Sequence, residues 1–330
     1  MNILTVSPSP HIKSGITTQK IMLTVIAALI PAIISGTIFF GPRALFMVIF
    51  CALVSMITEI VCRALMKKEG TVSDGSAMLT GVLLALNLPV TLPLWQAAVG
   101  CIFAIAVVKQ LFGGLGCNFA NPAITGRIFL LLSVGSDMTS WAVPFYYKHL
   151  PMLGLFEASG STALDGITGA TPLASGNAEL TQLFLGNIGG CIGETSALAL
   201  LIGGIFLIIS KLISPVTPFS YLGSLAVLTF AKVLITGGDM TEVPYALLSG
   251  GVILGAFFMA TDYVTSPITA KGKLIFGIGC GLTTFIIREF ASMPEGCSFS
   301  ILLMNLLTPY IDRLTKTKPV GARSASKERA

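Results

Sequence analysis

Apolar runs of about 20 residues recur along this chain and limit its fold more than any other feature. A run of that length crosses a hydrocarbon core of about 30 Å as an α-helix. The runs are continuous rather than alternating, which excludes a membrane β-barrel. Of 330 residues, 54% are hydrophobic and 11% charged, whereas soluble domains carry about a quarter charged residues. The sequence therefore predicts an all-α polytopic membrane protein.

Ten membrane spans are expected. The third contains Asn87, Pro89 and Pro93, and the sixth opens on the glycine-rich residues 189–193. Proline and glycine interrupt helices, so these two spans are predicted to be broken. The expected spans are residues 21–41, 43–66, 76–94, 95–112, 120–135, 185–210, 217–236, 243–261, 274–290 and 298–315.

The distribution of charge predicts an orientation. Most Lys and Arg residues, among them Lys20, Lys109, Arg127 and Lys232, are assigned to the cytoplasmic side or to helix ends, as the positive-inside rule requires. The first apolar run is too long for a cleavable signal. Both termini are then cytoplasmic. The chain divides into an N-terminal segment (1–20), a first membrane half (21–135), an outer loop (136–184), a second membrane half (185–315) and a basic tail (316–330).

A weak internal repeat relates the two halves. SDGSAMLTGVLLAL (73–86) is similar to GETSALALLIGGIF (193–206), with Asp74 aligned to Glu194, and NPAIT (121–125) is similar to SPIT (266–269). Five spans in each half make the copies inverted across the membrane, which is typical of transport folds with a site near the midplane. The alternative is that helices rich in small residues resemble one another by composition alone.

The polar segment DGITGATPL (165–173) lies in the predicted outer loop. Taken alone it is a turn, since Asp, Gly, Thr and Pro all favour turns. Its string D-x-x-T-G-A-T nevertheless matches the acceptor signature for covalent flavin attachment, in which a transferase joins the phosphate of FMN to the last threonine through a phosphodiester. The predicted attachment motif consists of Asp165, Thr168, Gly169, Ala170 and the acceptor Thr171.

Together with this segment, SPSPHIKSGITTQKIM, SDGSAMLTGVLLALNLP, GGLGCNFANPA and MATDYVTSPIT give a resemblance that runs over the whole length. The chain resembles the D subunits of Rnf electron-transport complexes and, through them, the B subunits of sodium-translocating NADH:quinone reductases. The resemblance implies a urea-transporter-like fold of two inverted five-helix halves. It also implies FMN on Thr171 and a second, non-covalent flavin, riboflavin, whose site these motifs do not locate.

The same resemblance implies a function in the bacterial cytoplasmic membrane. Electrons would pass from reduced ferredoxin to NAD⁺, coupled to export of Na⁺ or H⁺. The partners would be subunits that carry iron–sulfur centres, FMN and the NAD site, together with a flavin transferase for maturation. On this chain FGIGCG (276–281) and GGLG (113–116) do not complete a dinucleotide fingerprint. The basic balance reflects orientation and anionic lipid rather than nucleic acid.

A passive channel or solute transporter is the alternative function, because an inverted-repeat scaffold does not fix what the protein does. The attachment motif distinguishes the two hypotheses, since a channel has no use for it.

Charged residues inside apolar runs are costly and often mark pathways. Glu59, Glu194 and Asp262 lie within or at the edge of apolar runs. Glu194, its repeat partner Asp74, and Asp262 are candidates for an ion or second-flavin pathway. Lys109 and Lys232 are expected to reach the inner membrane surface along their aliphatic stems. The seven cysteines form no C-x-x-C pair, so no metal or disulfide framework is predicted. Cys117 is either redox-active or, in the favoured interpretation, incidental.

Overall fold

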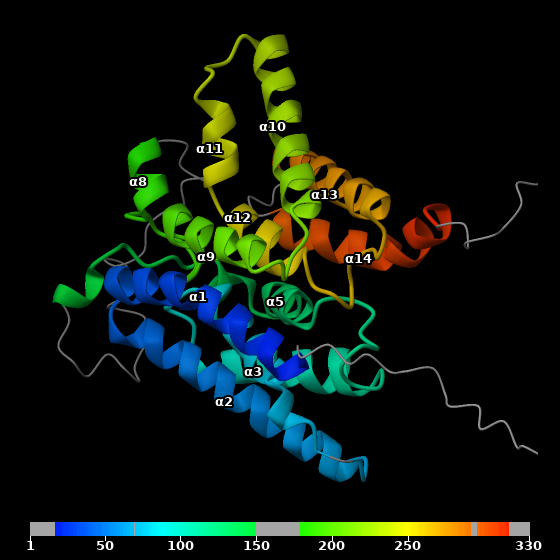
Figure 1. Cartoon of the computed structure of the whole chain (residues 1–330). Helices are drawn as coiled ribbons and strands as arrows, with labels where there is room; N and C mark the ends of the chain where they lie inside the picture. The colour runs from blue at the N-terminus through cyan, green and yellow to red at the C-terminus, as the bar shows by residue number, and fades with distance from the viewer. Residues whose placement is uncertain (1–16, 69, 150–178, 292–295, 317–330) are drawn as a thin grey trace, which may run out of the picture.

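The computed structural model describes residues 17–68, 70–149, 179–291 and 296–316 (Figure 1). The regular elements in these residues are all helices, as predicted. The first half contains α1 (Thr18–Phe40), α2 (Pro42–Leu65), η1 (Val72–Asp74), α3 (Ser76–Leu86), α4 (Leu94–Ile102), the π-helical η2 (Phe103–Gln110), α5 (Pro122–Ser133), α6 (Gly135–Met138) and η3 (Tyr146–His149). The second half contains α8 (Leu180–Leu185), α9 (Ala197–Ile209), α10 (Val216–Thr236), α11 (Glu242–Leu248), α12 (Val252–Leu254), the π-helical η5 (Gly255–Met259), α13 (Ala270–Phe290) and α14 (Cys297–Leu314).

Local sequence sets the ends of the long helices. The Thr17 side chain caps α1 by accepting from the Lys20 amide at 3.3 Å. Gly41 ends α1 with a positive φ of 79°, a conformation that glycine adopts without strain. Pro42 then opens α2 at a position where the missing N–H costs nothing. Gly41-Pro42 therefore makes a sharp turn between two long apolar helices.

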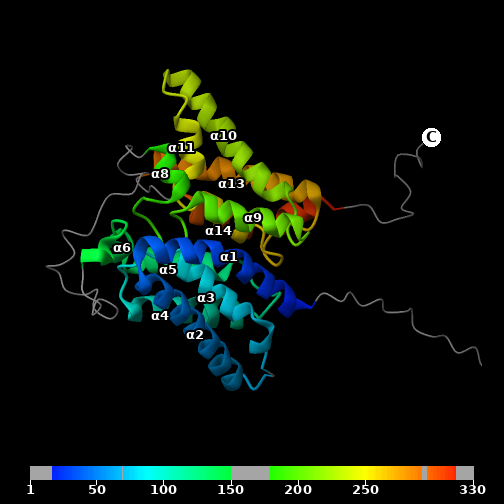
Figure 2. The same ribbon diagram turned by 60° about the vertical axis from the view of Figure 1, so that its left-hand side comes forward.

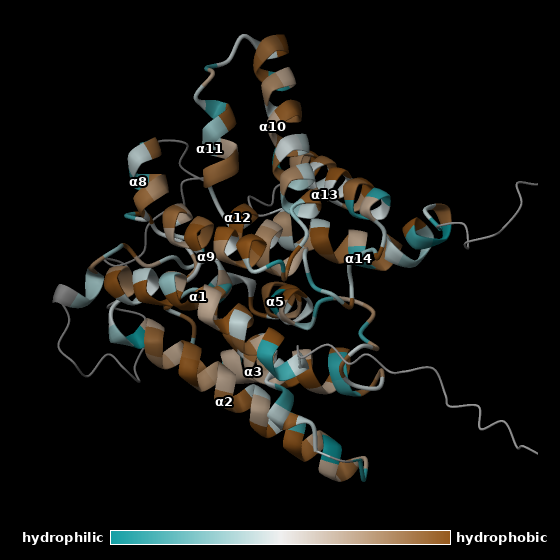
Figure 3. Cartoon of the chain, viewed as in Figure 1, coloured by the Kyte–Doolittle hydropathy of each residue, from teal (hydrophilic) through white to brown (hydrophobic). Residues whose placement is uncertain are grey.

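Four helices of the described residues are long and apolar enough to cross a membrane, namely α1, α2, α10 and α13, and the bent pair formed by α11 with 252–259 raises the number to five. Hydrophobic residues predominate on the four long helices, and hydrophilic residues gather at the C-terminal end of α2 (Figure 3). This supports a polytopic membrane protein. The full set of ten spans in two inverted halves stays a prediction.

The predicted breaks are confirmed, and one was missed. The helix of the third span, α3, ends at Leu86, and residues 87–93 are not helical before the fourth span begins with α4 at Leu94. The sixth is helical only from Ala197, in α9, and its opening residues 186–196 are not helical; α8, which precedes them, lies almost entirely in the predicted outer loop. The eighth, predicted as one plain helix, is instead bent by 61° between α11 and α12. Gly250 and Gly251 lie in the break, and Gly250 has a φ of 67°.

The two halves of the sequence lie side by side (Figures 1 and 2). Helices α1–α6 form one body and α8–α14 the other, and α1 packs on α9 where they meet. In both views the start of α1 and the end of α14 lie at the same end of the molecule, whereas α6 and α8 lie at the opposite end.

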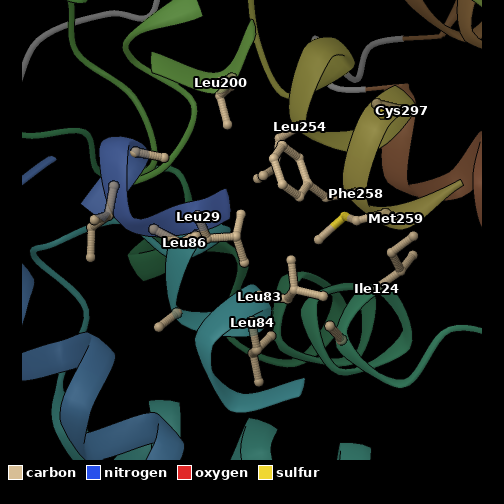
Figure 4. Packing of buried hydrophobic residues seen from close by; sticks show 14 of the residues in the cluster. Leu29, Leu83, Leu84, Leu86, Ile124, Leu200, Leu254, Phe258, Met259 and Cys297 are labelled. Carbon is tan, nitrogen blue, oxygen red and sulfur yellow. The ribbon is translucent and has the colours of Figure 1, made fainter. Parts of the chain in front are cut away.

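The apolar core joins the two bodies. Figure 4 shows side chains from α1, α3 and α5 facing side chains from α9, α12, η5 and α14. Leu86, Leu254 and Met259 are almost fully buried. The core therefore lies where the interrupted helices end.

Glycines allow the closest helix contacts. A Cβ on Gly203 of α9 would collide with the Ala28 carbonyl oxygen of α1. On α13, a Cβ on Gly277 or Gly281 would collide with a serine hydroxyl of α10. Small residues at such contacts are typical of membrane helices. The FGIGCG segment thus lies inside α13, and its glycines serve helix packing.

The local structure supports one part of the internal repeat. NPAIT and SPIT each follow a π-helical segment and lead into a helix: η2 precedes α5, and η5 precedes α13. Asn121 caps α5 through the amides of Ala123 and Ile124, and Thr269 caps α13 through the amide of Gly272.

We predict that Gly281→Ala destabilises the protein by about 1–3 kcal/mol, because the added methyl group overpacks a close contact with the α10 backbone. Gly223→Ala on α10 is the matched control, since nothing lies within 4 Å of its added Cβ. There the gain in helix propensity should stabilise by up to ~1 kcal/mol. Thermal unfolding of the detergent-solubilised variants measures both, and equal shifts of the same sign would contradict the prediction.

Candidate functional site

The predicted attachment motif lies outside the described residues, with all of its members: Asp165, Thr168, Gly169, Ala170 and Thr171. The structure therefore describes only the segments on either side of it.

Both flanking segments contact the end of α1. Before the motif, the Phe145 amide donates to the Phe39 carbonyl at 2.7 Å, and the rings of these two residues lie 5.5 Å apart. After it, Gly186 ends α8 with a φ of 107°, and a Cβ there would lie 2.9 Å from the Phe39 ring. Phe39 thus lies close to both described segments that flank the motif.

A charged cluster lies at the interface of α2 and η2. The Glu59 Oε1 atom accepts from Lys109 Nζ at 3.0 Å, Gln110 Nε2 at 2.7 Å and Thr71 Oγ1 at 3.1 Å. The side chains of Glu59 and Lys109 are each 1% exposed. Loss of either partner would leave the other charge buried, which is a costly state.

The candidate Asp74 belongs to the same cluster. Lys109 Nζ donates to Ser76 Oγ at 2.6 Å, and that hydroxyl donates to Asp74 Oδ1 at 2.6 Å. The prediction that Lys109 reaches the inner surface is therefore wrong. The π-helical η2 carries Lys109 at the interface with α2, where a buried carboxylate replaces water as the partner of its ammonium group.

A second charged cluster lies between the two bodies. Arg127 Nη1 on α5 donates to Glu194 Oε1 at 2.8 Å, Asn87 Oδ1 at 2.9 Å and Ser298 Oγ at 3.2 Å. Arg127 Nη2 donates to Cys191 Sγ at 3.4 Å. The charged side chains are each 4% exposed. Arg127 therefore lies in the middle of α5 rather than at a helix end, with partners from both halves of the chain, and its membrane side stays a prediction.

Helix ends favour the signs of these two charges. Asn87 is the C-cap of α3, so the guanidinium lies where the α3 dipole is negative. Glu194 precedes Ser196, the N-cap of α9, so the carboxylate lies where the α9 dipole is positive. Each charge is stabilised by the helix end beside it.

The third candidate, Asp262, lines a cavity between the two bodies. The cavity measures ≈ 80 Å³, and its polar lining includes Lys109, Asn118, Asn121 and Asp262. Its apolar lining comes from α1, α3, α9 and η5, and includes Phe257 and Phe258. Asp262 Oδ2 accepts from Thr265 Oγ1 at 3.1 Å. Burial raises the pKa of the Asp262 carboxyl above its ordinary value.

Of the three pathway candidates, Asp74 and Asp262 lie near one cavity. Ser76, which bonds Asp74, and Lys109 both line it. Glu194 lies apart, in the cluster with Arg127. Sequence reasoning missed Arg127 and Asn87 as polar partners. The signal was a lone arginine inside a short apolar span, which requires a buried partner.

Lys232 pairs with two carboxylates of neighbouring helices. Its Nζ lies 2.8 Å from Glu289 Oε1 and 3.6 Å from Glu242 Oε2. Both contacts hold Lys232 among carboxylates of the same chain, and which membrane surface it faces stays a prediction. The three residues tie together the ends of α10, α11 and α13.

Cys117 lies in a loop of unusual backbone. Gly113, Gly114 and Gly116 have φ values of 123°, 98° and 93°, a region that glycine adopts without strain. The Cys117 side chain is exposed, and a redox role for it stays untested.

A family model described as the NQR2, RnfD, RnfE family matches residues 5–321. The chain belongs to this family. It is 49% identical to the D subunit of the Na(+)-translocating ferredoxin:NAD(+) oxidoreductase complex of Acetobacterium woodii, over 98% of each chain. It is 39% identical to the D subunit of the proton-translocating ferredoxin:NAD(+) oxidoreductase complex of Clostridium ljungdahlii, over 98% of this chain and 97% of the other. The D subunit of the ion-translocating oxidoreductase complex of Stutzerimonas stutzeri is 38% identical over 94% of each chain. The predicted resemblance is confirmed.

We predict that Lys109→Met destabilises the protein by about 3–5 kcal/mol, because it leaves the buried Glu59 carboxylate without its cation. Adding Glu59→Gln should recover a large part of the loss. Lys232→Met is the control, because its side chain is 33% exposed and such pairs contribute about 0–1 kcal/mol. Thermal unfolding in detergent ranks the three variants, and a double variant no more stable than Lys109→Met would contradict the explanation.

Proposed function

We propose that this chain is the flavin-carrying membrane subunit of an ion-translocating ferredoxin:NAD⁺ oxidoreductase complex. It carries FMN on Thr171 and relays electrons in a process coupled to export of Na⁺ or H⁺. The observation that carries the proposal is the complete D-x-x-T-G-A-T string in a chain whose full-length relatives are named as D subunits of such complexes. One of these relatives is named for Na⁺ and another for protons, so the comparison leaves both ions open.

The location of the flanking segments supports an exposed acceptor. Residues 149 and 179 border the attachment segment, and the helices on either side of it lie at the end of the molecule opposite the start of α1. With the N-terminus in the cytoplasm, the segment lies on the outer face of the bacterial cytoplasmic membrane. FMN supplies the electron chemistry there, while the protein sets its position and surroundings.

The partners follow from what this chain lacks in its sequence. It completes no dinucleotide fingerprint and has no C-x-x-C pair. The NAD site, the iron–sulfur centres and a further FMN are therefore assigned to other subunits of the complex. A flavin transferase attaches FMN to Thr171 during maturation.

The cavity beside Asp262 is the proposed site of the second flavin, riboflavin. Aromatic and aliphatic walls with a few polar groups are typical of cofactor sites. The Asn118 Oδ1 atom is buried without a hydrogen-bond partner, and it fits the ring N–H donor of a flavin. The ≈ 80 Å³ of the present cavity corresponds to a few water molecules at roughly 30 Å³ each. Flavin binding therefore requires side chains such as Phe258 to turn aside.

Covalent attachment is tested on the full chain expressed with its flavin transferase. We expect a band that fluoresces under ultraviolet light in a denaturing gel, and an intact mass increased by one FMN less one water. Thr171→Val should lose both, because valine offers no hydroxyl. Thr162→Val is the matched control, because it makes the same change just outside the motif, and it should keep both. An unmodified wild-type peptide in the active complex would contradict the proposal.

The second flavin is tested separately. Denaturing the purified protein should release riboflavin, and Asn118→Leu should reduce the amount strongly, because the substitution removes the polar partner and fills space. Cys117→Ser, in the same loop but exposed, should leave it unchanged. Fluorescence from Thr171 should persist in both variants. Equal release from Asn118→Leu and wild type would place riboflavin elsewhere.

A further inference from the structure

Helices α3 and α9 of the two interrupted spans are each too short to cross a membrane. Helix α3 has 11 residues, and at 1.5 Å per residue it spans about 16 Å, roughly half of a 30 Å hydrocarbon core. The segment that follows α3 pairs with the segment that precedes α9. The Gly193 amide donates to the Leu86 carbonyl at 2.8 Å, and the Ile192 amide to the Leu88 carbonyl at 3.1 Å.

Such a junction is a weak point in a barrier to ions. Non-helical backbone at membrane depth is tolerated only where protein or a water-filled cavity surrounds it. Helix ends add partial charges that attract ions of either sign. In transport folds, paired broken helices form the place where solutes bind and cross.

In this protein a buried ion pair occupies the junction. Arg127 contacts Asn87 on one side and Glu194 on the other, at 2.9 and 2.8 Å. Ser298 of α14 accepts from the same guanidinium nitrogen. A Cβ on Gly251 would lie 2.7 Å from Glu194 Oε1, so the α11–α12 break also closes on the pair. Leu86 and Ile192, beside it, are buried.

We propose that the Arg127–Glu194 pair seals the junction of the broken helices against ions. The arginine repels cations, the glutamate repels anions, and together they neutralise each other at a place where a single charge would attract counter-ions. The seal prevents ions that the complex has translocated from returning through the interior of this chain. The inference depends on the membrane fold and the family, and not on attachment of FMN to Thr171.

Two substitutions, each of which removes one charge and keeps a polar side chain, make the proposal testable through the sign of the leak. Arg127→Gln leaves Glu194 as the only charge at the junction, so it should admit Na⁺ and H⁺. Glu194→Gln leaves Arg127, so it should admit chloride. Each passive flux should rise at least about tenfold, which corresponds to a barrier lowered by ~1.4 kcal/mol, while the flux of ions of the opposite sign stays near the wild-type value.

The full-length chain is reconstituted in liposomes for the measurement. Release of radioactive sodium, a pH-sensitive dye and a chloride-sensitive dye report the three fluxes. Lys232→Gln and Glu289→Gln are the matched controls, because they break an ion pair of equal N–O distance, 2.8 Å, that is about one-third exposed at the helix ends. Both controls should remain as tight as wild type. Size-exclusion chromatography and circular dichroism establish that each variant is folded.

Two outcomes overturn the proposal. The first is a folded Arg127→Gln or Glu194→Gln that is as tight as wild type. The second is a leak with no preference for the sign of the ion, which indicates general loosening of the fold. If neither single variant folds, the double variant Arg127→Gln/Glu194→Gln, which contains no buried charge, takes their place. Its passive fluxes of cations and of chloride should both exceed those of wild type. Fluxes equal to wild type would show that the charges do not form the seal.

Discussion

The buried contact between Arg127 and Glu194 links the two bodies at the place where the interrupted helices meet. Removing two charges from water costs several kcal/mol for each ion, and mutual attraction alone seldom offsets that cost. Here the guanidinium also bonds Asn87 and Ser298, at 2.9 and 3.2 Å, and each charge lies beside a helix end of opposite sign. The pair is therefore stable only when α3, α5, α9 and α14 are all in place, which couples the halves of the chain to one another.

Close packing elsewhere keeps those helices at the required distance. Gly203 brings α9 against the backbone of α1, and Gly277 and Gly281 bring α13 against α10. Lipid tails are as apolar as leucine side chains, so helices in a membrane associate mainly through packing and hydrogen bonds rather than through expulsion of water. Glycine at these crossings lets the two helix backbones approach closely, which strengthens both the packing and the hydrogen bonds between them. Gly277 and Gly281, which in the sequence resemble part of a nucleotide-binding motif, thus serve the packing of α13 on α10.

Much of the fold could be predicted because membrane helices leave a local signal. Apolar length located the helices to within a few residues, and Pro89, Pro93 and the glycines at 189–193 located two of the breaks. The missed break at Gly250-Gly251 contains no proline, and its polar neighbours are few. The pairing of charges could not be predicted, because Lys109 and Arg127 lie 50 and 67 residues from the carboxylates they contact. Sequence showed that such charges need partners, but only the fold determines which partners they meet.

The separation of the two proposed flavin positions limits how electrons can pass. Ile21 lines the cavity, and Phe39 contacts the segments that flank the attachment motif. These residues are 18 positions apart on α1, which corresponds to about 27 Å along a helix. Between them lie the apolar core and the Arg127–Glu194 pair, with no proposed redox group among the described residues there. On the proposed assignment, the covalent flavin and the riboflavin therefore serve opposite faces of the membrane. A partner subunit must then supply any carrier between them.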